Sequence, residues 1–377
     1  MIFMFFRLLS EGDFQMHLNR SKTFNRAGVN FSLFFIMIMV SVSLSFSGLA
    51  LSRAFCSEAK VNFEMICLGA GGGDVSSDLT SLMVKPADYA DYSVILDGGS
   101  VAEGIVEHGK STGKLSLRAD PEERVKYVAE VLKKVEGIIL THSHLDHVSG
   151  FTVLGPLFLN MHFQWKTPSF RVLASPETFE SLETLLYSGK IWGNFGYFPK
   201  GNTILKYEKI AIGQTFEIGG LRGTRFLVDH PVESSAFLLE NSGGAKFLFF
   251  GDTGQLRKEF YDVFNPYVAD RTLRGVILEV SFPSASKDLA AKTCHLTRDT
   301  LLIELGKLAG LSIEGELPFK DEFVAEQAAK IAVIIDFPIY IVHIKPWDYR
   351  QVVSELETLK KAGINIIVTA QGEHYSF

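Results

Sequence analysis

Runs rich in β-branched and aromatic residues alternate with amphipathic stretches from about residue 61 to the end of the chain. These runs predict strands in the first half at residues 61–69, 80–85, 93–97, 137–141 and 171–174. The second half repeats the pattern, with strands expected at residues 203–207, 223–228, 235–240, 246–250, 275–280, 339–344 and 364–369. Apolar residues at helical spacing predict helices at residues 121–135, 176–187, 297–309, 322–335 and 349–362.

The arrangement of these elements predicts the fold class. The sequence Asn-Ser-Gly-Gly at residues 241–244 separates two predicted strands and favours antiparallel pairing there. Two mixed β-sheets packed face to face and flanked by helices account for the pattern better than one doubly wound sheet. We therefore expect an α/β fold of the αββα sandwich type, formed by residues 57–377 as one domain.

Residues 1–56 have a different composition. Three basic residues, Arg20, Lys22 and Arg26, precede an uncharged apolar run at residues 29–51. A basic segment followed by an apolar one is typical of a secretory signal peptide, which predicts an exported, periplasmic or cell-surface protein. Because the run is long enough to span a bilayer, an uncleaved membrane anchor is the alternative. Any membrane contact is expected through this segment alone.

Details of this segment leave its processing open. Gly48 and Ala50 are small enough for the −3 and −1 positions of a cleavage site. Lipidation of Cys56 is an alternative, although Phe55 before it is larger than such processing favours. Met16 is an alternative start, because the stretch ahead of the apolar run is long for a signal peptide.

Composition and charge narrow the classes of partner. The chain has 377 residues, of which 47% are hydrophobic and 21% charged, so it can bury a sizeable core. Its formal net charge is −6, which disfavours an RNA or DNA polymer as a partner, since such binding depends on neutralising phosphates. The three cysteines lack the close pairing of a zinc knuckle or a disulfide scaffold, and we interpret Cys67 and Cys294 as ordinary packed residues.

The densest chemical signal follows the predicted strand at residues 137–141. His142, His144, Asp146 and His147 place four metal-ligand side chains within six positions. A strand that ends in a tight turn can direct imidazoles and a carboxylate into one pocket. We therefore predict that all four side chains bind metal.

Three further residues are candidates to complete a two-metal site. His230, Asp252 and His343 each lie where another predicted strand gives way to a loop. Each has an ordinary alternative, such as a buried hydrogen-bonded histidine for His343 or a turn residue for Asp252. Together with the first four residues they predict two divalent metal ions, with zinc expected and manganese or iron as alternatives.

The order His-x-His-x-Asp-His, followed by lone His, Asp and His ligands, resembles the metallo-β-lactamase superfamily. More narrowly, the chain resembles the class II cyclic-nucleotide phosphodiesterases over residues 63–374. The resemblance rests on the sequence blocks at residues 68–73, 96–99, 141–150, 191–195, 230–237, 251–253, 279–282, 294–297 and 343–346. The superfamily motif indicates only the fold, whereas the later blocks, in this order, favour the narrower family.

Two departures and one glycine-rich block qualify the resemblance. The family usually has proline where this chain has Gly193 and Arg298, and neither position is a metal ligand. The glycines at residues 69–73 lack the Gly-x-Gly-x-x-Gly spacing of a dinucleotide site. We interpret them as a loop that allows the backbone to approach the site closely.

The resemblance implies a metallo-β-lactamase-type fold and hydrolysis of 3′,5′-cyclic nucleotides, cAMP first and cGMP second, to nucleoside 5′-phosphates. The implied mechanism is attack by a hydroxide that bridges the two metal ions. Asp146 is expected to orient this hydroxide as well as to bind metal. His295 is expected to protonate the departing O3′ or to contact the phosphate, with helix capping as its alternative.

The nucleotide base requires a flat, partly apolar slot. We predict that the aromatic-rich segment at residues 158–165, together with Trp192, Asn194, Phe195 and Tyr197, forms this slot, with packing in the core as the alternative. Polar groups beside the metals would contact phosphate or ribose. The predicted substrate contacts are Trp192, Asn194, Phe195, Ser234, Ser235 and His295.

Two classes of alternative remain. An RNA 3′-processing nuclease, a sulfatase and a lactonase of the same superfamily would share the ligands, although the absence of a basic domain disfavours the nuclease. A metal-dependent protein that binds cyclic nucleotide without turnover is an alternative of a different class, and the intact ligand set argues against it. The expected partner is thus a small cyclic nucleotide, and a homodimer is left open.

Overall fold

The computed structural model describes residues 60–197, 200–201 and 203–377. The predictions of a signal peptide, a membrane anchor and lipidation concern residues 1–56, which are outside the described residues. Residues Val61–Phe377 form one compact unit. Among the described residues, every helix is too short or too polar to cross a lipid bilayer.

The first of two seven-stranded sheets contains most strands of the N-terminal half. Its order is β14 (His374–Ser376), β1 (Phe63–Gly69), β2 (Ser81–Pro86), β3 (Val94–Leu96), β4 (Gly137–Ile139), β5 (Phe170–Ala174) and β6 (Leu205–Lys209). Pairing is antiparallel from β14 to β3 and parallel from β3 to β6. The sheet is therefore mixed, as predicted.

The second sheet repeats this division with later strands. Its order is β13 (Ile366–Val368), β12 (Ile339–Val342), β11 (Leu273–Glu279), β10 (Lys246–Phe250), β9 (Ser234–Asn241), β8 (Leu221–Val228) and β7 (Thr215–Ile218). Pairing is parallel from β13 to β10 and antiparallel from β10 to β7. Strands β8, β10, β11 and β12 consequently run in one direction and end at the same edge.

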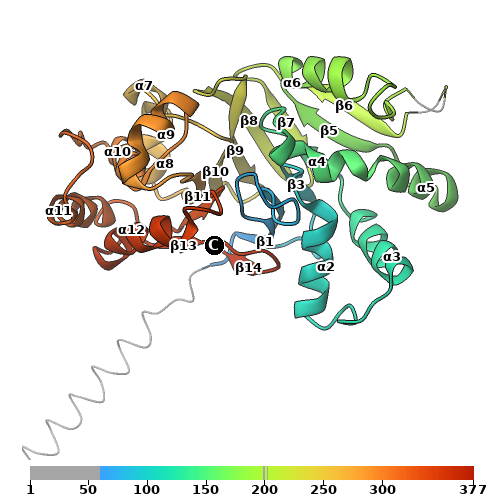
Figure 1. Ribbon diagram of the computed structural model, residues 1–377, viewed down its shortest axis with the longest axis horizontal. Coiled ribbons are helices and arrows are strands. Elements are labelled where there is room, and N and C mark those ends of the chain that lie inside the picture. The colour runs from blue at the N-terminus through green and yellow to red at the C-terminus, as the bar shows by residue number, and fades with distance from the viewer. Residues whose placement is uncertain (1–59, 198–199, 202) are drawn as a thin grey trace, which may run out of the picture. The chain divides into compact units, whose positions relative to one another are not determined.

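Helices cover the outer face of each sheet (Figure 1). Those over the first sheet are α2 (Val101–Ser111), α3 (Pro121–Leu132), α4 (Leu145–Val153), α5 (Gly155–Trp165) and α6 (Pro176–Ser181), the last continued by the π-helical turn Leu182–Leu186. Those over the second are α7 (Lys258–Asp262), α8 (Asn265–Ala269), α9 (Lys287–Thr293), α10 (Arg298–Leu308), α11 (Asp321–Ala332) and α12 (Tyr349–Lys361). A 3₁₀ turn, Ser284–Ser286, precedes α9. The unit is the predicted αββα sandwich.

Hydrophobic side chains form three cores, one between each sheet and its helices and one between the two sheets. In β1, Ile66 and Leu68 pack against helices, whereas Met65 and Cys67 pack between the two sheets. Successive side chains of a strand point to opposite faces, so both faces of this strand are buried. This two-sided burial explains why the predicted strands appear as apolar runs. Burial also raises the pKa of the Cys67 thiol to about 12, so Cys67 packs as an apolar residue.

Local sequence signals account for some elements and not for others. Helix α3 begins after Asp120, whose carboxylate accepts from the backbone N–H of Glu123 while the Glu123 carboxylate accepts from that of Asp120. The elements that the sequence analysis missed include α2, α5, α7, α8, α9, β7 and β14. Strand β14 has only three residues, two of them exposed, and long-range pairing with β1 rather than apolar alternation holds it in the sheet.

Candidate metal centre

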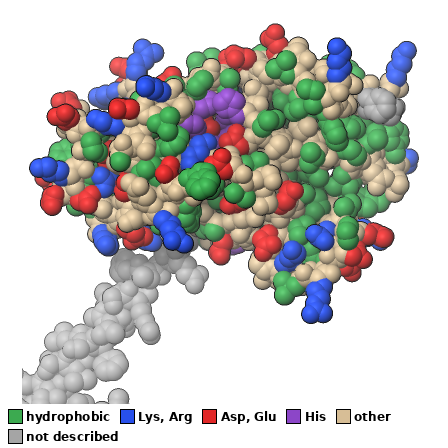
Figure 2. All heavy atoms as spheres, viewed as in Figure 1, with side chains coloured by type: hydrophobic (Ala, Val, Ile, Leu, Met, Phe, Trp, Pro, Cys, Tyr) green, Lys and Arg blue, Asp and Glu red, His purple; other side chains and the backbone are tan. Residues whose placement is uncertain are grey.

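All seven predicted ligands lie beyond the ends of strands at one edge of the sandwich. The loop after β4 carries His142 and His144, and the first turn of α4 carries Asp146 and His147. The other three, His230, Asp252 and His343, follow β8, β10 and β12. In the space-filling view, histidine side chains are visible together at the surface in this region (Figure 2). The fold thus brings together residues that are up to two hundred positions apart in the sequence.

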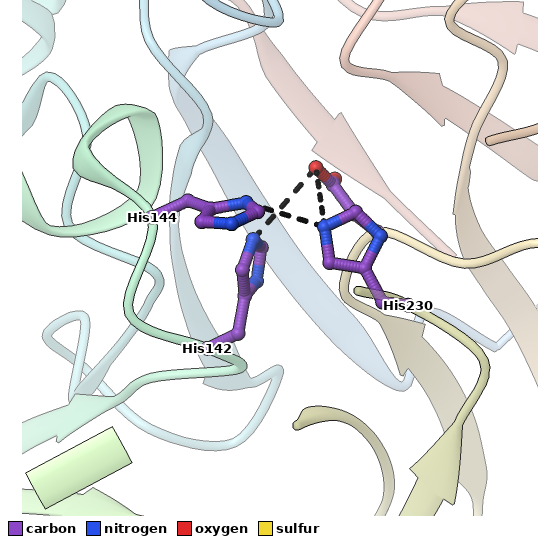
Figure 3. Close-up of side chains that lie close together, drawn as sticks. His142, His144 and His230 are labelled. Carbon is purple, nitrogen blue, oxygen red and sulfur yellow. Dashed lines mark hydrogen bonds and ion pairs between the residues drawn. The ribbon is translucent and has the colours of Figure 1, made fainter. Parts of the chain in front are cut away.

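A first group combines three histidines with one carboxylate (Figure 3). One donor atom from each of His142, His144, His230 and Asp252 lies within 4.8 Å of the others. Oδ2 of Asp252 lies 3.8 Å from Nε2 of His142 and 3.9 Å from Nε2 of His230. Such a set of imidazoles and one carboxylate suits a divalent transition metal.

A second group lies on the other side of the same carboxylate. Donor atoms of Asp146, His147 and His343 lie within 4.8 Å of one another. Nε2 of His147 is 3.3 Å from Oδ1 of Asp252, and Nε2 of His343 is 3.1 Å from Oδ2. Asp252 therefore faces both groups and can contribute to two neighbouring metal sites.

Buried nitrogen atoms provide a test of whether this set fits metal ions. Nε2 of His142 and Nε2 of His147 are buried without a hydrogen-bond partner. A buried polar atom without a partner is costly unless something outside the polypeptide satisfies it. Both atoms face Asp252, where the two groups meet. The residues therefore fit divalent metal ions.

The Nδ1 atoms of four histidines are held by neighbouring groups, which directs each Nε2 toward the centre. The pairs are His142 with Thr141 Oγ1 at 2.9 Å, His147 with Asp97 Oδ2 at 2.8 Å, His230 with the Cys294 carbonyl at 3.2 Å and His343 with Ser281 Oγ at 2.9 Å. Partners of this kind fix the orientation of a metal-binding imidazole. These contacts therefore fix the orientation of all four rings.

Burial sets the protonation of the first group. It lowers the pKa of His142 and His144 and lowers that of His230 to about 4, so these imidazoles are neutral at pH 7. For Asp252, burial acts to raise the pKa, but His343 and His147 outweigh it and hold the pKa well below its usual range. Neutral imidazoles and an ionised carboxylate are the forms that bind metal.

Asp97 contacts both ends of the segment that carries the first four predicted ligands, at Thr141 and at His147. Its carboxylate is fully buried and accepts from the backbone N–H of Thr141 at 2.7 Å, from the Thr141 hydroxyl at 2.8 Å and from His147 Nδ1 at 2.8 Å. Its backbone has φ of 56°, an unfavourable left-handed conformation for a residue other than glycine. Asp97 therefore positions the loop that carries the first ligands.

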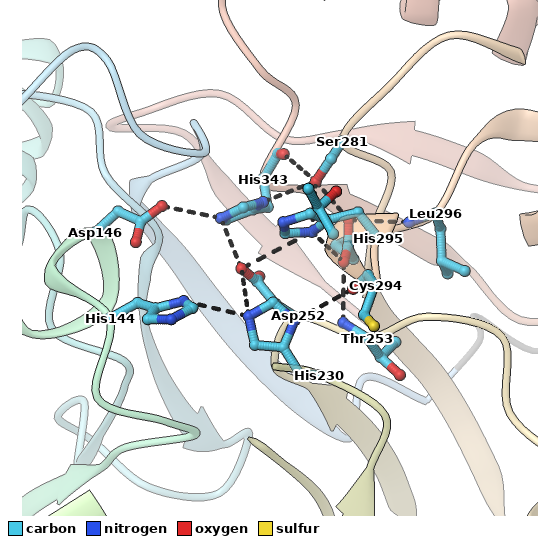
Figure 4. A network of polar contacts seen from close by, with 12 residues as sticks. His144, Asp146, His230, Asp252, Thr253, Ser281, Cys294, His295, Leu296 and His343 are labelled. Carbon is cyan, nitrogen blue, oxygen red and sulfur yellow. Dashed lines mark hydrogen bonds and ion pairs between the residues drawn. The ribbon is translucent and has the colours of Figure 1, made fainter. Parts of the chain in front are cut away.

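Glu279 has the corresponding role on the second sheet, where it contacts Thr253, Ser281 and His295, which are labelled in Figure 4. Its buried carboxylate accepts from the Thr253 backbone N–H at 2.9 Å and from the hydroxyl of Ser281, and it contacts Nδ1 of His295 at 2.7 Å. Ser281 in turn contacts His343. One carboxylate thus orients both a predicted ligand and the predicted proton donor.

The glycine-rich block approaches the centre closely, as predicted. A Cβ added at Gly72 would lie 2.6 Å from Nδ1 of His343, closer than any real contact. His343 itself has φ of 62°, so the chain turns sharply where it leaves β12. A side chain at Gly72 would displace this ligand, and glycine is required there.

The predicted substrate residues lie in different surroundings from the ligands. Ser234 and Ser235 are fully buried, and the Ser235 hydroxyl accepts from Nε of Arg225 at 2.8 Å. Phe195 is 7% exposed and packs in the core beneath the helices, with Trp192 against the same core. These placements do not support direct contact with a ligand by Phe195 or the two serines.

Asn194 and His295 differ from those residues. The Asn194 carbonyl oxygen accepts from the Gly196 backbone N–H at 3.0 Å and from the Tyr207 hydroxyl at 3.1 Å, so it organises its own loop. His295 lies against the metal ligands, with its ring stacked on that of His343 at 5.3 Å between centroids. Of the predicted substrate contacts, His295 is therefore the one placed at the centre.

Sequence reasoning assigned no role to three residues that the structure places around the ligands. Asp97, Glu279 and Lys345 all lie in blocks on which the family resemblance rests. Nζ of Lys345 is 4.0 Å from Oδ2 of Asp146, and its side chain is about a quarter exposed. Each follows or ends a buried strand on the side of the centre, the same signal that identified the ligands.

Comparisons with known proteins agree with this geometry. Residues 112–273 match the model of the beta-lactamase superfamily domain, and residues 214–372 match that of the class-II cAMP phosphodiesterases. A probable 3′,5′-cyclic-nucleotide phosphodiesterase of Yersinia pestis is 29% identical over 90% of this chain and 95% of its own length. A 3′,5′-cyclic-nucleotide phosphodiesterase of Aliivibrio fischeri is 26% identical over 84% of this chain and 93% of its own length.

Solved structures share the fold. Unliganded yeast PDE1 aligns with a TM-score of 0.66 at 20% identity, covering 84% of this chain and all of its own. The metallo-beta-lactamase fold protein YhfI from Bacillus subtilis aligns with a TM-score of 0.52 at 16% identity and the same coverage. The sandwich and its ligands therefore define a metallo-β-lactamase-fold hydrolase. Within that superfamily, the chain is similar to the class II cyclic-nucleotide phosphodiesterases, over residues 214–372 for the family model and over most of its length for the two curated relatives.

The position of Asp97 leads to a prediction about metal affinity. In Asp97→Asn, one acceptor oxygen becomes an NH₂ group, so Thr141 and His147 can no longer both be held. We expect Zn²⁺ affinity to fall about 10–100-fold, the range for loss of a group that orients a ligand. The affinity for Zn²⁺ is measured by competition with a chromophoric chelator. Asp262→Asn, at an exposed position at the end of α7, is the matched control and should leave affinity unchanged. Wild-type affinity in Asp97→Asn would contradict the positioning role.

Proposed function

We propose that the chain hydrolyses 3′,5′-cyclic nucleotides to nucleoside 5′-phosphates, with cAMP as the first substrate and cGMP as the second. The observation that carries the proposal is the complete ligand set on both sides of the Asp252 carboxylate. A bimetal centre of this kind suits phosphodiester hydrolysis. The activity named for the relatives from Yersinia pestis and Aliivibrio fischeri supports the choice of substrate.

The proposed cofactor is a pair of divalent ions, with zinc as the native metal because imidazole nitrogen predominates among the ligands. One ion would be held by His142, His144, His230 and Asp252, and the other by Asp146, His147, His343 and Asp252. When bound, two such ions activate a water molecule and hold the phosphoryl oxygens as their negative charge increases.

His295 is the proposed proton donor to the departing O3′. Burial lowers its pKa, but the adjacent Glu279 carboxylate outweighs burial and raises it, which favours the protonated imidazole. Because Nδ1 donates to Glu279, Nε2 is the atom that can release a proton. After transfer, the neutral ring keeps its bond to Glu279 and its orientation.

Lys345 is the proposed contact for a phosphoryl oxygen. Its ammonium lies near Asp146 at the rim of the centre, and its backbone N–H donates to the Ser281 carbonyl at 3.1 Å, which anchors the residue beside the network around Glu279. A lysine presents a compact positive charge with three donors. It can thus bind the phosphate without displacing a metal ligand.

Export is also proposed, on sequence alone. The basic residues followed by the apolar run at residues 29–51 favour a location outside the cytoplasm, where the enzyme would scavenge nucleotides. The alternative is an enzyme that stays attached to the membrane by an uncleaved N-terminal segment, with its catalytic domain outside the cytoplasm. Cleavage would be checked by N-terminal sequencing of the mature chain.

The direct test of this proposal is an assay of the purified full chain with Zn²⁺. We expect release of 5′-AMP from 3′,5′-cAMP, loss of this release on chelation, and recovery when Zn²⁺ is restored. Asp252→Ala should abolish turnover, because it removes the carboxylate common to both groups, whereas Asp262→Ala should retain it. A folded, Zn²⁺-loaded wild-type chain that hydrolyses neither cAMP nor cGMP would contradict the proposed function.

The role of His295 gives a second prediction, which depends on the leaving group. In His295→Gln, kcat for cAMP should fall about 10²–10⁴-fold, the usual contribution of a general acid. Turnover of methyl p-nitrophenyl phosphate should fall much less, because p-nitrophenolate departs without protonation. His374→Gln, at an exposed histidine, should change neither. Equal losses on both substrates would show that His295 has a different role, such as holding the metal centre in place.

A further inference from the structure

A pocket of about 370 Å³ lies beside the metal centre and contains none of its ligands. Its walls come from the loop between β1 and β2, the segment that follows β12 and the loop before β14. Its volume is within the range of small-molecule sites, roughly 300–1,000 Å³. Three segments far apart in the sequence therefore form a cavity large enough for one flat ring system.

Gly73 connects this pocket to the centre. It lines the pocket, and a Cβ added there would lie 3.7 Å from Oδ2 of Asp146 and 3.7 Å from Nζ of Lys345. Ile344 and Pro346, on either side of Lys345, line the pocket as well. One stretch of backbone therefore borders both the pocket and the rim of the metal centre near Lys345.

The pocket offers an apolar surface with one aromatic ring. Ile344 and Pro346 contribute apolar contacts, and Tyr349 lines the pocket with 46% of its surface exposed. Bases stack on aromatic rings of this kind whatever their identity. The lining thus suits a planar heterocycle.

The polar groups in the lining include two that accept hydrogen bonds. The Asp78 carboxylate accepts from the Ala70 backbone N–H at 2.9 Å, and burial raises the pKa of Asp78. The Gln371 amide donates to the carbonyls of Leu68 and Ser77, so it can only accept further hydrogen bonds. A ligand edge that donates N–H groups would complement these residues.

We propose that this pocket holds the purine base of the cyclic nucleotide, stacked on Tyr349 with an N–H edge toward Asp78. The inference rests on the proposed function and adds a base-binding site to it. Guanine presents two adjacent donors, N1–H and the N2 amino group, to a carboxylate, whereas adenine presents one amino group beside the acceptor N1. Asp78 is therefore a specificity-determining residue that lets the pocket accept guanine as well as adenine.

The slot predicted at residues 192–195 is a poorer candidate. Phe195 fills the core, and a Cβ added at Gly155 would lie 2.2 Å from its ring. The Asn194 carbonyl already accepts two hydrogen bonds. The predicted slot has an exposed ring in Tyr197, as the pocket beside Gly73 has in Tyr349, but this pocket also has acceptors that can take further hydrogen bonds.

The test uses two pocket variants and one matched control in the full chain with Zn²⁺. Tyr349→Ala should raise KM for both cyclic nucleotides about tenfold, because base stacking is lost. Asp78→Asn should lower the ratio of kcat/KM for cGMP to that for cAMP about tenfold, because an amide pairs with adenine better than with the two donors of guanine. Tyr89→Ala, at a tyrosine of similar exposure (43%) in the turn before β3, should change neither.

Two further measurements separate this inference from the proposed function. Methyl p-nitrophenyl phosphate has no base, so its turnover should be the same in wild type, Tyr349→Ala and Asp78→Asn. Calorimetric titration with 5′-GMP reports binding without turnover and should show weaker affinity in both variants. The base pocket alone would be overturned if the wild type hydrolyses cyclic nucleotides while both variants keep the wild-type KM, the wild-type ratio of kcat/KM for cGMP to that for cAMP, and the wild-type affinity for 5′-GMP. Absence of hydrolysis in wild type would overturn the proposed function, and 5′-GMP titration would still test the pocket.

Discussion

The carboxylate of Asp252 is buried where the two groups of ligands meet, and its two oxygens face histidines on both sides. Burying a charge is costly unless opposite charges and donors surround it. Here Oδ1 faces Nε2 of His147, and Oδ2 faces Nε2 of His142, His230 and His343. Two of these nitrogen atoms, in His142 and His147, are buried without a hydrogen-bond partner, which fits a site for divalent cations. The other groups of the centre are arranged around this carboxylate.

The sandwich provides this geometry by ending strands of both sheets at one edge. Asp97 beyond β3 and Glu279 at the end of β11 are buried carboxylates that hold the loops of the first and second sheet. Asp97 and His343 both have positive φ, so the backbone is strained where it turns toward the centre. The packed cores beneath can sustain this strain, since the strands that enter these turns are buried on both faces.

The sequence predicted the sandwich and the group of histidines and aspartates that gathers at its edge, because the signals for both are local. The His-x-His-x-Asp-His block is contiguous, and the lone ligands follow apolar runs whose ends are visible without a structure. The base pocket could not be predicted in this way. Asp78, Tyr349 and Gln371 are separated by long stretches of sequence, and only the pairing of β14 with β1 brings the last of these loops beside the first. The aromatic block at residues 192–195 drew the prediction elsewhere, because composition does not distinguish a core ring from an exposed one.

The central claim is that one carboxylate unites two metal sites, and counting bound ions tests it most directly. Native mass spectrometry of the Zn²⁺-loaded chain should show two ions per wild-type chain. Asp252→Ala, with its fold verified by circular dichroism, should show fewer than two. A wild-type chain that binds one ion, or an Asp252→Ala chain that still binds two, would contradict the account.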